Sequence, residues 1–129
     1  MPRSARKKSA VTLSPRFRIF YCDQIALGPG KVELLKAIKE TGSIRQAASN
    51  LEMSYMRAWL LIRTMNQCFR EPLVDAARGG AAFGGAKLTP TGASALELYE
   101  RLEAESLAAT RSTRRELERL LNPVPAKQR

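Results

Sequence analysis

The sequence has no histidine among its 129 residues and only two cysteines, Cys22 and Cys68. The missing histidine removes the commonest general base and excludes serine or cysteine nucleophiles that rely on a histidine partner. Two cysteines do not supply the four ligands of a structural zinc site, nor a disulfide framework. We therefore predict no enzyme activity and no metal site, and we expect both cysteines to be small buried apolar residues.

Long apolar runs are missing as well. No uninterrupted apolar stretch approaches the roughly 20 residues that a membrane-spanning helix requires. The basic start of the chain lacks the apolar segment of a secretory signal. We expect a cytoplasmic protein without a membrane partner, long enough for one domain with its own core.

Acidic residues are absent from residues 1–18, which hold six of the 22 basic residues and contribute to a net charge of +10. Residues 111–129 are also basic. Between these ends, residues 43–70 carry four arginines against one glutamate, whereas residues 91–110 carry four glutamates against one arginine. A basic central stretch beside basic tails is typical of a nucleic-acid-binding protein. Tails that only increase solubility, or bind polyanions without specificity, are the alternative.

The central stretch, residues 43–69, predicts two short helices joined by a tight turn. Ser43 can cap the first helix, with Gln46 reaching back to complete a capping box, and Ser54 can cap the second. Apolar residues recur at helical spacing on one inner face of each helix: Ile44, Ala47, Ala48 and Leu51, then Ala58, Ile62, Met65 and Phe69. A helix-turn-helix presents the outer face of its second helix to the DNA major groove. Periodicity alone fits an ordinary helical hairpin equally well.

Two elements are expected before this stretch. Residues 17–25 are rich in aromatic and β-branched residues, which predicts one strand. Pro29 suits the first turn of an amphipathic helix, and Gly42 is a typical helix end.

A glycine-rich hairpin is expected after the second helix. Leu73 and Val74 begin a short strand, and four glycines follow between Gly79 and Gly85. Such a sequence predicts a hairpin whose tip approaches a partner closely. Beside a helix-turn-helix this hairpin is a wing, and its flanking bases can meet phosphates or the minor groove. A nucleotide-binding loop is disfavoured because neither glycine motif of that class is present.

A long closing helix is expected to begin after Thr89 or Thr91. Its apolar stripe is predicted to contain Ala95, Leu98, Leu102 and Ala109, with Leu96 and Tyr99 widening it. We expect this helix to pack partly on its own domain and partly on a second copy, although packing on its own core alone fits the pattern as well. Thr113 with Glu116 predicts a separate short helix.

Together these elements predict a mainly α protein with a small β part, a winged helix-turn-helix with a β-hairpin wing and a long C-terminal helix. The winged domain is expected over residues 16–110. Residues 1–15 are predicted to be a disordered basic arm, and residues 111–129 a C-terminal helix extension with a frayed tail.

Three stretches resemble one family: residues 42–66, residues 73–89 with their paired glycines before AKLT, and the pattern that starts at Thr91–Gly92 and ends at Leu102. They are similar to the N-terminal DNA-binding domain of the ModE-type, molybdate-responsive bacterial regulators, a relative of the LysR-type winged helix. The resemblance covers roughly residues 17–107. It implies a homodimeric transcription factor that binds a two-fold operator in double-stranded DNA.

The resemblance also implies a set of DNA-binding residues. Those at the exposed start of the recognition helix are Ser54, Tyr55, Met56, Arg57 and Trp59. Those on the supporting helix are Ser43, Arg45 and Gln46. Those on the wing are Arg78, Gly79, Gly80, Gly84, Gly85 and Lys87. Arg63, on the outer surface of the second helix, completes the set. The sequence leaves two positions for the side chain of Trp59, which either faces DNA or lies half buried against the first helix.

Two departures from the family pattern matter. Glu52 stands at a corner where the family often has glycine, and a left-handed backbone there costs about 1 kcal/mol, so we expect a slightly different turn. Only eight residues follow Leu121, so we expect neither the family's molybdate site nor another cofactor in this chain. Three alternatives remain: a nonspecific nucleoid-type DNA-binding protein, a partner subunit of a full-length ligand-sensing regulator, and a small enzyme that uses the glycine loop and Lys87.

Overall fold

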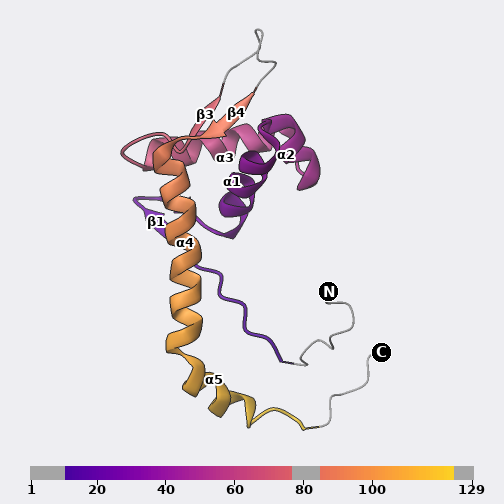
Figure 1. The fold of residues 1–129 in the computed structure, drawn as a ribbon, viewed down its shortest axis with the longest axis vertical. Helices are drawn as coiled ribbons and strands as arrows, with labels where there is room; N and C mark the ends of the chain where they lie inside the picture. The colour runs from indigo at the N-terminus through magenta and orange to yellow at the C-terminus, as the bar shows by residue number, and fades with distance from the viewer. Residues whose placement is uncertain (1–10, 77–84, 124–129) are drawn as a thin grey trace. The chain divides into compact units, whose positions relative to one another are not determined.

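The computed structural model describes residues 11–76 and 85–123 and divides the chain into two compact units. The first unit is Arg16–Leu102, and the second combines Met1–Pro15 with Glu103–Arg129. The elements that begin in the first unit are β1 (Ile19–Tyr21), β2 (Gln24–Leu27), α1 (Pro29–Thr41), α2 (Ile44–Asn50), α3 (Tyr55–Cys68), β3 (Val74–Ala76), β4 (Ala86–Leu88) and α4 (Pro90–Ala109) (Figure 1). The second unit contains α5 (Arg111–Glu118).

The N-terminal strand is a hairpin. The prediction of one strand over residues 17–25 is wrong, because β1 and β2 pair antiparallel around a turn at Cys22 and Asp23. Cys22 has a left-handed φ of 55° and is exposed in this turn. Cys68 is only partly buried at the end of α3, with its Sγ 3.7 Å from Oε1 of Gln24. The expectation of two buried cysteines is therefore also wrong, since both residues lie at the ends of elements.

The core of the first unit lies among α1, α2 and α3. Its fully buried large side chains come from these helices and the residue before β3: Leu34, Leu35, Ile38, Ile44, Ile62, Met65 and Leu73. Alanines with almost no exposed surface, Ala47 and Ala48 of α2 and Ala58 of α3, let the helices pack closely. The predicted end of α1 at Gly42 is confirmed. Gly42 has a left-handed φ of 70° and donates its N–H to the carbonyl of Ile38 at 2.8 Å.

The base of the β3–β4 hairpin is fixed to the helices on two sides. The N–H of Ala86 donates to the carbonyl of Gly42 at 2.9 Å, which ties β4 to the turn between α1 and α2. Asn66 of α3 accepts the N–H groups of Leu73 and Val74 on its Oδ1, at 2.8 and 3.2 Å. Its Nδ2 donates to the carbonyl of Val74 at 3.2 Å. The hairpin therefore starts from a fixed position beside α2 and α3.

Helix α4 begins with a close contact. Thr89 caps it by accepting the N–H of Gly92 at 2.9 Å on its Oγ1, which settles the choice between Thr89 and Thr91. A Cβ on Gly92 would stand 2.0 Å from the carbonyl oxygen of Leu73, so only glycine fits there. Tyr99 donates its hydroxyl to the carbonyl of Phe17 at 2.8 Å.

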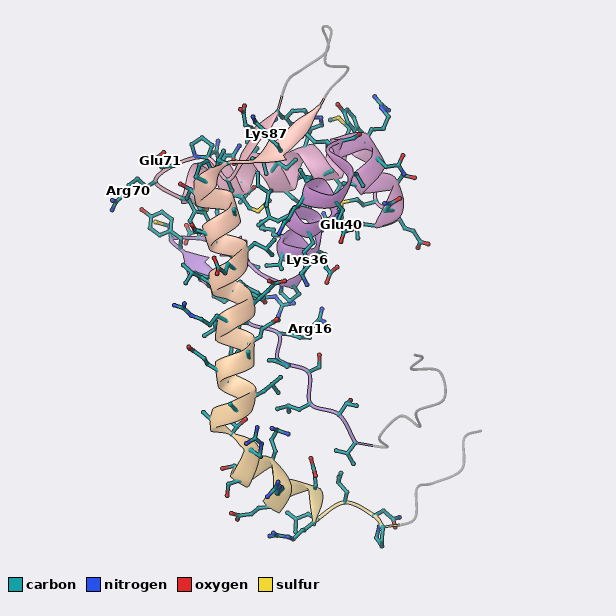
Figure 2. The ribbon with its side chains drawn as sticks, in the orientation of Figure 1. Arg16, Lys36, Glu40, Arg70, Glu71 and Lys87 are labelled. Carbon is teal, nitrogen blue, oxygen red and sulfur yellow. The ribbon has the colours of Figure 1, made fainter. Side chains whose placement is uncertain are left out.

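The buried face of α4 differs from the predicted stripe. Leu96 and Tyr99 are buried, whereas Leu98 and Leu102 keep 52 % and 39 % of their surface exposed. The reason is that Gly92, Leu96 and Tyr99 follow the helical repeat from the Leu73 contact. Glu100 on the same helix forms a surface ion pair at 3.5 Å with Lys36 of α1, whose position Figure 2 labels.

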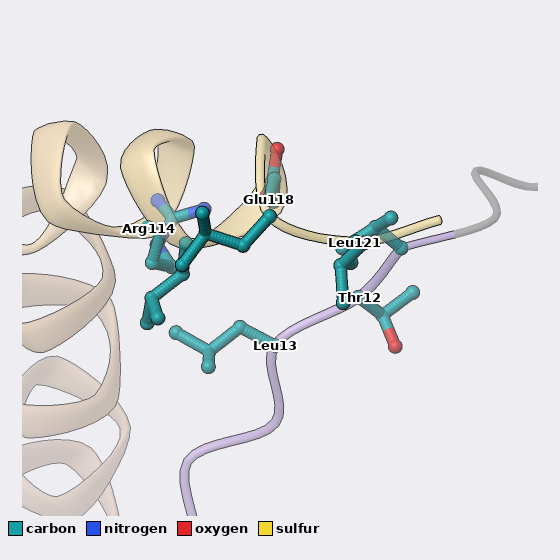
Figure 3. A pocket seen from close by; sticks show the side chains of 8 residues that line it. Thr12, Leu13, Arg114, Glu118 and Leu121 are labelled. Atoms are coloured by element: carbon teal, nitrogen blue, oxygen red, sulfur yellow. The ribbon is translucent and has the colours of Figure 1, made fainter. Parts of the chain in front are cut away.

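The second unit holds the short helix α5. This helix begins at Arg111 after Thr110, so the predicted cap at Thr113 is wrong. Nη2 of Arg114 donates to the carbonyl of Leu107 at 2.8 Å. An apolar pocket of about 350 Å³ lies between residues 11–13 and the leucines at the end of α5 (Figure 3). None of the helices in the described ranges combines the length and the apolar composition that a bilayer-crossing segment requires.

Candidate nucleic-acid interface

Helices α2 and α3 are both capped by serine, as predicted. Ser43 accepts the N–H of Gln46 and Ser54 accepts the N–H of Arg57, each on Oγ at 3.0 Å. The second half of the predicted capping box is wrong, because Gln46 donates its side-chain amide to Oδ1 of Asn50 at 2.9 Å. The start of α3 is thus fixed by its cap.

The turn between α2 and α3 has the hydrogen bonds of a Schellman motif. The N–H of Met53 donates to the carbonyl of Ala48, and that of Glu52 to the carbonyl of Ser49, both at 3.0 Å. Glu52 has a φ of 57°, the left-handed conformation that glycine adopts at low cost. We expected a turn slightly different from one with glycine at this position, and the turn does not differ in this way. The two backbone hydrogen bonds hold Glu52 in the left-handed conformation.

The inner and outer faces of α3 separate clearly. Ala58, Ile62 and Met65 have at most 1 % of their surface exposed. Arg57 and Arg63 are exposed, as predicted. The residues directly opposite the buried row follow a 4, 3, 4 spacing: Met56, Leu60, Arg63 and Gln67, all of them exposed. This outer row combines two apolar side chains with one charged and one amide side chain.

Tyr55 and Trp59 lie on the flank of α3 and are partly buried. The guanidinium of Arg45, from α2, lies 4.4 Å from the centroid of the Tyr55 ring, within the range of a cation–π interaction. The rings of Tyr55 and Trp59 meet edge to face, with centroids 6.2 Å apart. Arg45, Tyr55 and Trp59 thus form one continuous stack, which we call the flank stack. Trp59 is half-buried against the core, and contact of its remaining exposed surface with DNA stays a prediction.

Lys31, in the first turn of α1, is partly buried. Burial lowers the pKa of Lys31; the Cys68 thiol acts in the opposite direction, and the Arg57 guanidinium lowers the pKa further.

The wing residues are only partly described. Lys87 is exposed on β4 (Figure 2), where it pairs with Asp75 of β3 in the strand register. Gly85 forms a β-bridge with Ser43, which places the base of the wing at the start of α2. The other predicted wing residues lie outside the described part of the chain: Arg78, Gly79, Gly80 and Gly84.

Sequence reasoning missed four residues of this region. Leu60 and Gln67 belong to the outer row, and the 4, 3, 4 spacing from Met56 could have identified them. Lys31 and Asn66 act from positions that periodicity does not mark, since one contributes charge from α1 and the other holds β3 by three hydrogen bonds. In the part of the chain that the structure describes, no three His, Cys, Asp or Glu residues are grouped so as to hold a metal ion.

Residues 30–93 match the family of bacterial regulatory helix-turn-helix proteins described as the lysR family. The chain carries a lysR-type helix-turn-helix domain. This domain also resembles a crystal structure of a CbnR_DBD–DNA complex, with a TM-score of 0.51 and 23 % identity over 67 % of this chain and 95 % of that one. The predicted fold class, a mainly α winged helix-turn-helix with a small β part, is confirmed.

Curated relatives confirm the resemblance to ModE-type proteins. The chain is 45 % identical over 78 residues to the molybdenum-pterin-binding protein MopB of Rhodobacter capsulatus. It is 42 % identical over 84 residues to the molybdenum transport protein ModE of Azotobacter vinelandii. It is 43 % identical over 74 residues to the DNA-binding transcriptional dual regulator ModE of Escherichia coli K12. These matches cover 60 %, 65 % and 57 % of this chain but only 29 %, 31 % and 28 % of the relatives.

Proposed function

We propose that this protein is a sequence-specific DNA-binding transcriptional regulator that acts as a dimer on a two-fold operator. The observation that supports it is the exposed face of α3, where Arg57 and Arg63 project from a helix capped by Ser54. A helix-turn-helix uses this face to reach base edges in the major groove. The likeness to proteins named as ModE regulators supports the same function.

The proposed mechanism is binding without a covalent step. Arginines and backbone N–H groups hold the phosphates and set the register, which is the part of the affinity that salt weakens. Side chains of α3 then distinguish base pairs, and an arginine that pairs with guanine contributes about 1–3 kcal/mol of discrimination. The flank stack holds Arg45 beside the start of α3, where its charge can meet a phosphate.

A second copy would dock on α4. Leu98 and Leu102 are exposed one turn apart on this helix, and burying the exposed part of each leucine stabilises an interface by roughly 1 kcal/mol. Two copies would repeat the α3 contacts at half-sites about one turn of DNA apart.

Selection of bound fragments from a genomic library tests the proposed function. We expect a few fragments to survive competition with an excess of random-sequence DNA, and their affinity to fall steeply as salt rises. Sites beside genes of molybdate transport or metabolism are expected among them, given the names of the relatives. Equal binding to random DNA would instead indicate a nonspecific architectural protein.

Light scattering tests the proposed dimer. Leu98→Asp and Leu102→Asp are expected to halve the mass of the particle and to weaken binding to the full operator far more than to one half-site. Leu120→Asp, at a leucine that is 81 % exposed outside this surface, is the matched control. An unchanged mass in both α4 variants would show that α4 is not the interface.

A further inference from the structure

The outer row of α3 contains two large apolar side chains that the fold leaves uncovered. Met56 is 76 % exposed and Leu60 is 51 % exposed, one helical turn apart. Both lie opposite the buried row that starts at Ala58, so packing within the domain does not require either of them. An exposed apolar pair at the start of a row that continues with Arg63 and Gln67 indicates contact with an apolar group of a partner.

The surroundings of this pair identify the partner as a polyanion. Arg57 and Arg63 project from the same helix, and Arg45 is held beside its first turn. Between residues 43 and 70 the only acidic residue is Glu52, in the turn before α3. A protein partner with an apolar surface would not need this ring of positive charge, whereas DNA does.

The major groove of DNA offers one apolar group, the C5-methyl of thymine. Thioether and isobutyl side chains offer no strong hydrogen bond, so they cannot read the donors and acceptors of the other bases. We propose that Met56 and Leu60 select thymine at two positions of each half-site by packing on its C5-methyl group. This inference rests on the proposed function, because it names what α3 reads at the same interface.

The spacing of the two side chains determines how far apart the thymines are. One helical turn advances 5.4 Å along α3, and successive base pairs are about 3.4 Å apart. Met56 and Leu60 therefore contact methyl groups one or two base pairs apart. The side chain of Leu60 is shorter and branched, whereas that of Met56 is unbranched and flexible. We therefore expect the thymine that contacts Leu60 to be selected more strictly than the one that contacts Met56.

Replacement of single thymines by deoxyuracil tests this directly, because the change removes only the methyl group. On an operator taken from the genomic selection, each half-site is expected to contain two thymines whose replacement weakens binding by about fourfold, the effect of one buried methyl group. In Leu60→Ala the effect is lost at one of these positions and kept at the other. In Met56→Ala the pattern is reversed.

Leu121→Ala is the matched control, since Leu121 is 53 % exposed and lies outside α3. Its deoxyuracil profile is expected to equal that of the wild type. Thermal melting and light scattering of all variants establish that each is folded and has the same mass.

Failure of the inference is distinguishable from failure of the proposed function. If no genomic fragment resists competition by random DNA, the proposed function is wrong. If specific binding is found but deoxyuracil weakens it nowhere, or equally in wild type and both variants, thymine selection is wrong and the regulator remains. A change of particle mass in Met56→Ala or Leu60→Ala would show that the row contacts protein, which also overturns the inference.

Discussion

The two faces of α3 share two kinds of apolar residue but differ in how much of their surface is exposed. The inner row is Ala58, Ile62 and Met65, and the outer row begins with Met56 and Leu60. Both rows contain a methionine and a branched aliphatic side chain. The inner residues have at most 1 % of their surface exposed, while Met56 has 76 % and Leu60 has 51 %. The methionine and the branched aliphatic residue of each row are therefore alike in chemistry and differ in position on the helix, while Arg63 and Gln67 occur only in the outer row.

The difference shows which residues fold the domain and which it offers to a partner. The inner row is fixed by α1 and α2, against which it packs. The outer row has no such neighbour in the described first unit. Its residue types therefore depend on the chemistry of the ligand and not on packing. Substitutions on the inner row should change stability, and those on the outer row should change DNA binding at nearly constant stability.

The largest expected effect comes from the inner row. Met65→Ala should lower the free energy of unfolding by about 2–5 kcal/mol, because it removes a fully buried side chain and leaves a cavity. Leu60→Ala, one helix face away, should change it by no more than about 0.5 kcal/mol. Urea denaturation of both variants measures the contrast. Similar losses in the two variants would show that Leu60 is a packing residue.

Arg57→Ala tests the outer face. Specific affinity should fall by about 5- to 150-fold, which corresponds to the 1–3 kcal/mol of an arginine–guanine pair, and random-sequence affinity should fall much less. Arg70→Ala is the control, because it removes the same charge from an exposed loop residue after α3 (Figure 2). Fluorescence anisotropy with both kinds of DNA gives the ratio. Equal losses on specific and random DNA would mean that Arg57 contacts only phosphates.

Local rules were sufficient to predict most of the helical framework. The serine caps at Ser43 and Ser54, the glycine end of α1 at Gly42 and the inner row of α3 each depend on residues within one or two turns. The N-terminal hairpin was not predictable in this way. Its turn uses Cys22 in a left-handed conformation, although cysteine is not a typical residue for such a turn.

The candidate interface was predicted less completely than the fold. The exposure of Arg57 and Arg63 follows from the helical repeat. The same repeat places the apolar residue Leu60 on the outer row, although Leu60 was not among the predicted residues. Tyr55 was expected to face outward. It is partly buried because it packs against the core, and Arg45, from another helix, lies over its ring. Contacts between helices of this kind cannot be read from the periodicity of either helix.

The turn before α3 determines which row faces outward, and Glu52 is its least favourable residue. Glu52→Gly should raise the free energy of unfolding by about 0.5–1 kcal/mol, because glycine adopts a φ of 57° without the cost of a Cβ but is more flexible when unfolded. Glu52→Ala should give no such gain, since alanine keeps the Cβ. Thermal melting compares the two. An equal gain in Glu52→Ala would attribute the effect to loss of the carboxylate instead.

The smallest expected effect lies between the two faces, in the flank stack. Arg45→Ala should lower the free energy of unfolding by about 0.5 kcal/mol, the size of an exposed cation–π contact. A double-mutant cycle with Tyr55→Leu isolates this contact from other effects of each substitution. Without DNA the coupling between Arg45 and Tyr55 should be small. With operator DNA it should increase, because the stack holds the guanidinium in place for a phosphate before binding. A coupling energy that is the same with and without DNA would mean that the stack only supports the fold. Met56, and not Tyr55, would then be the first residue of α3 that contacts DNA.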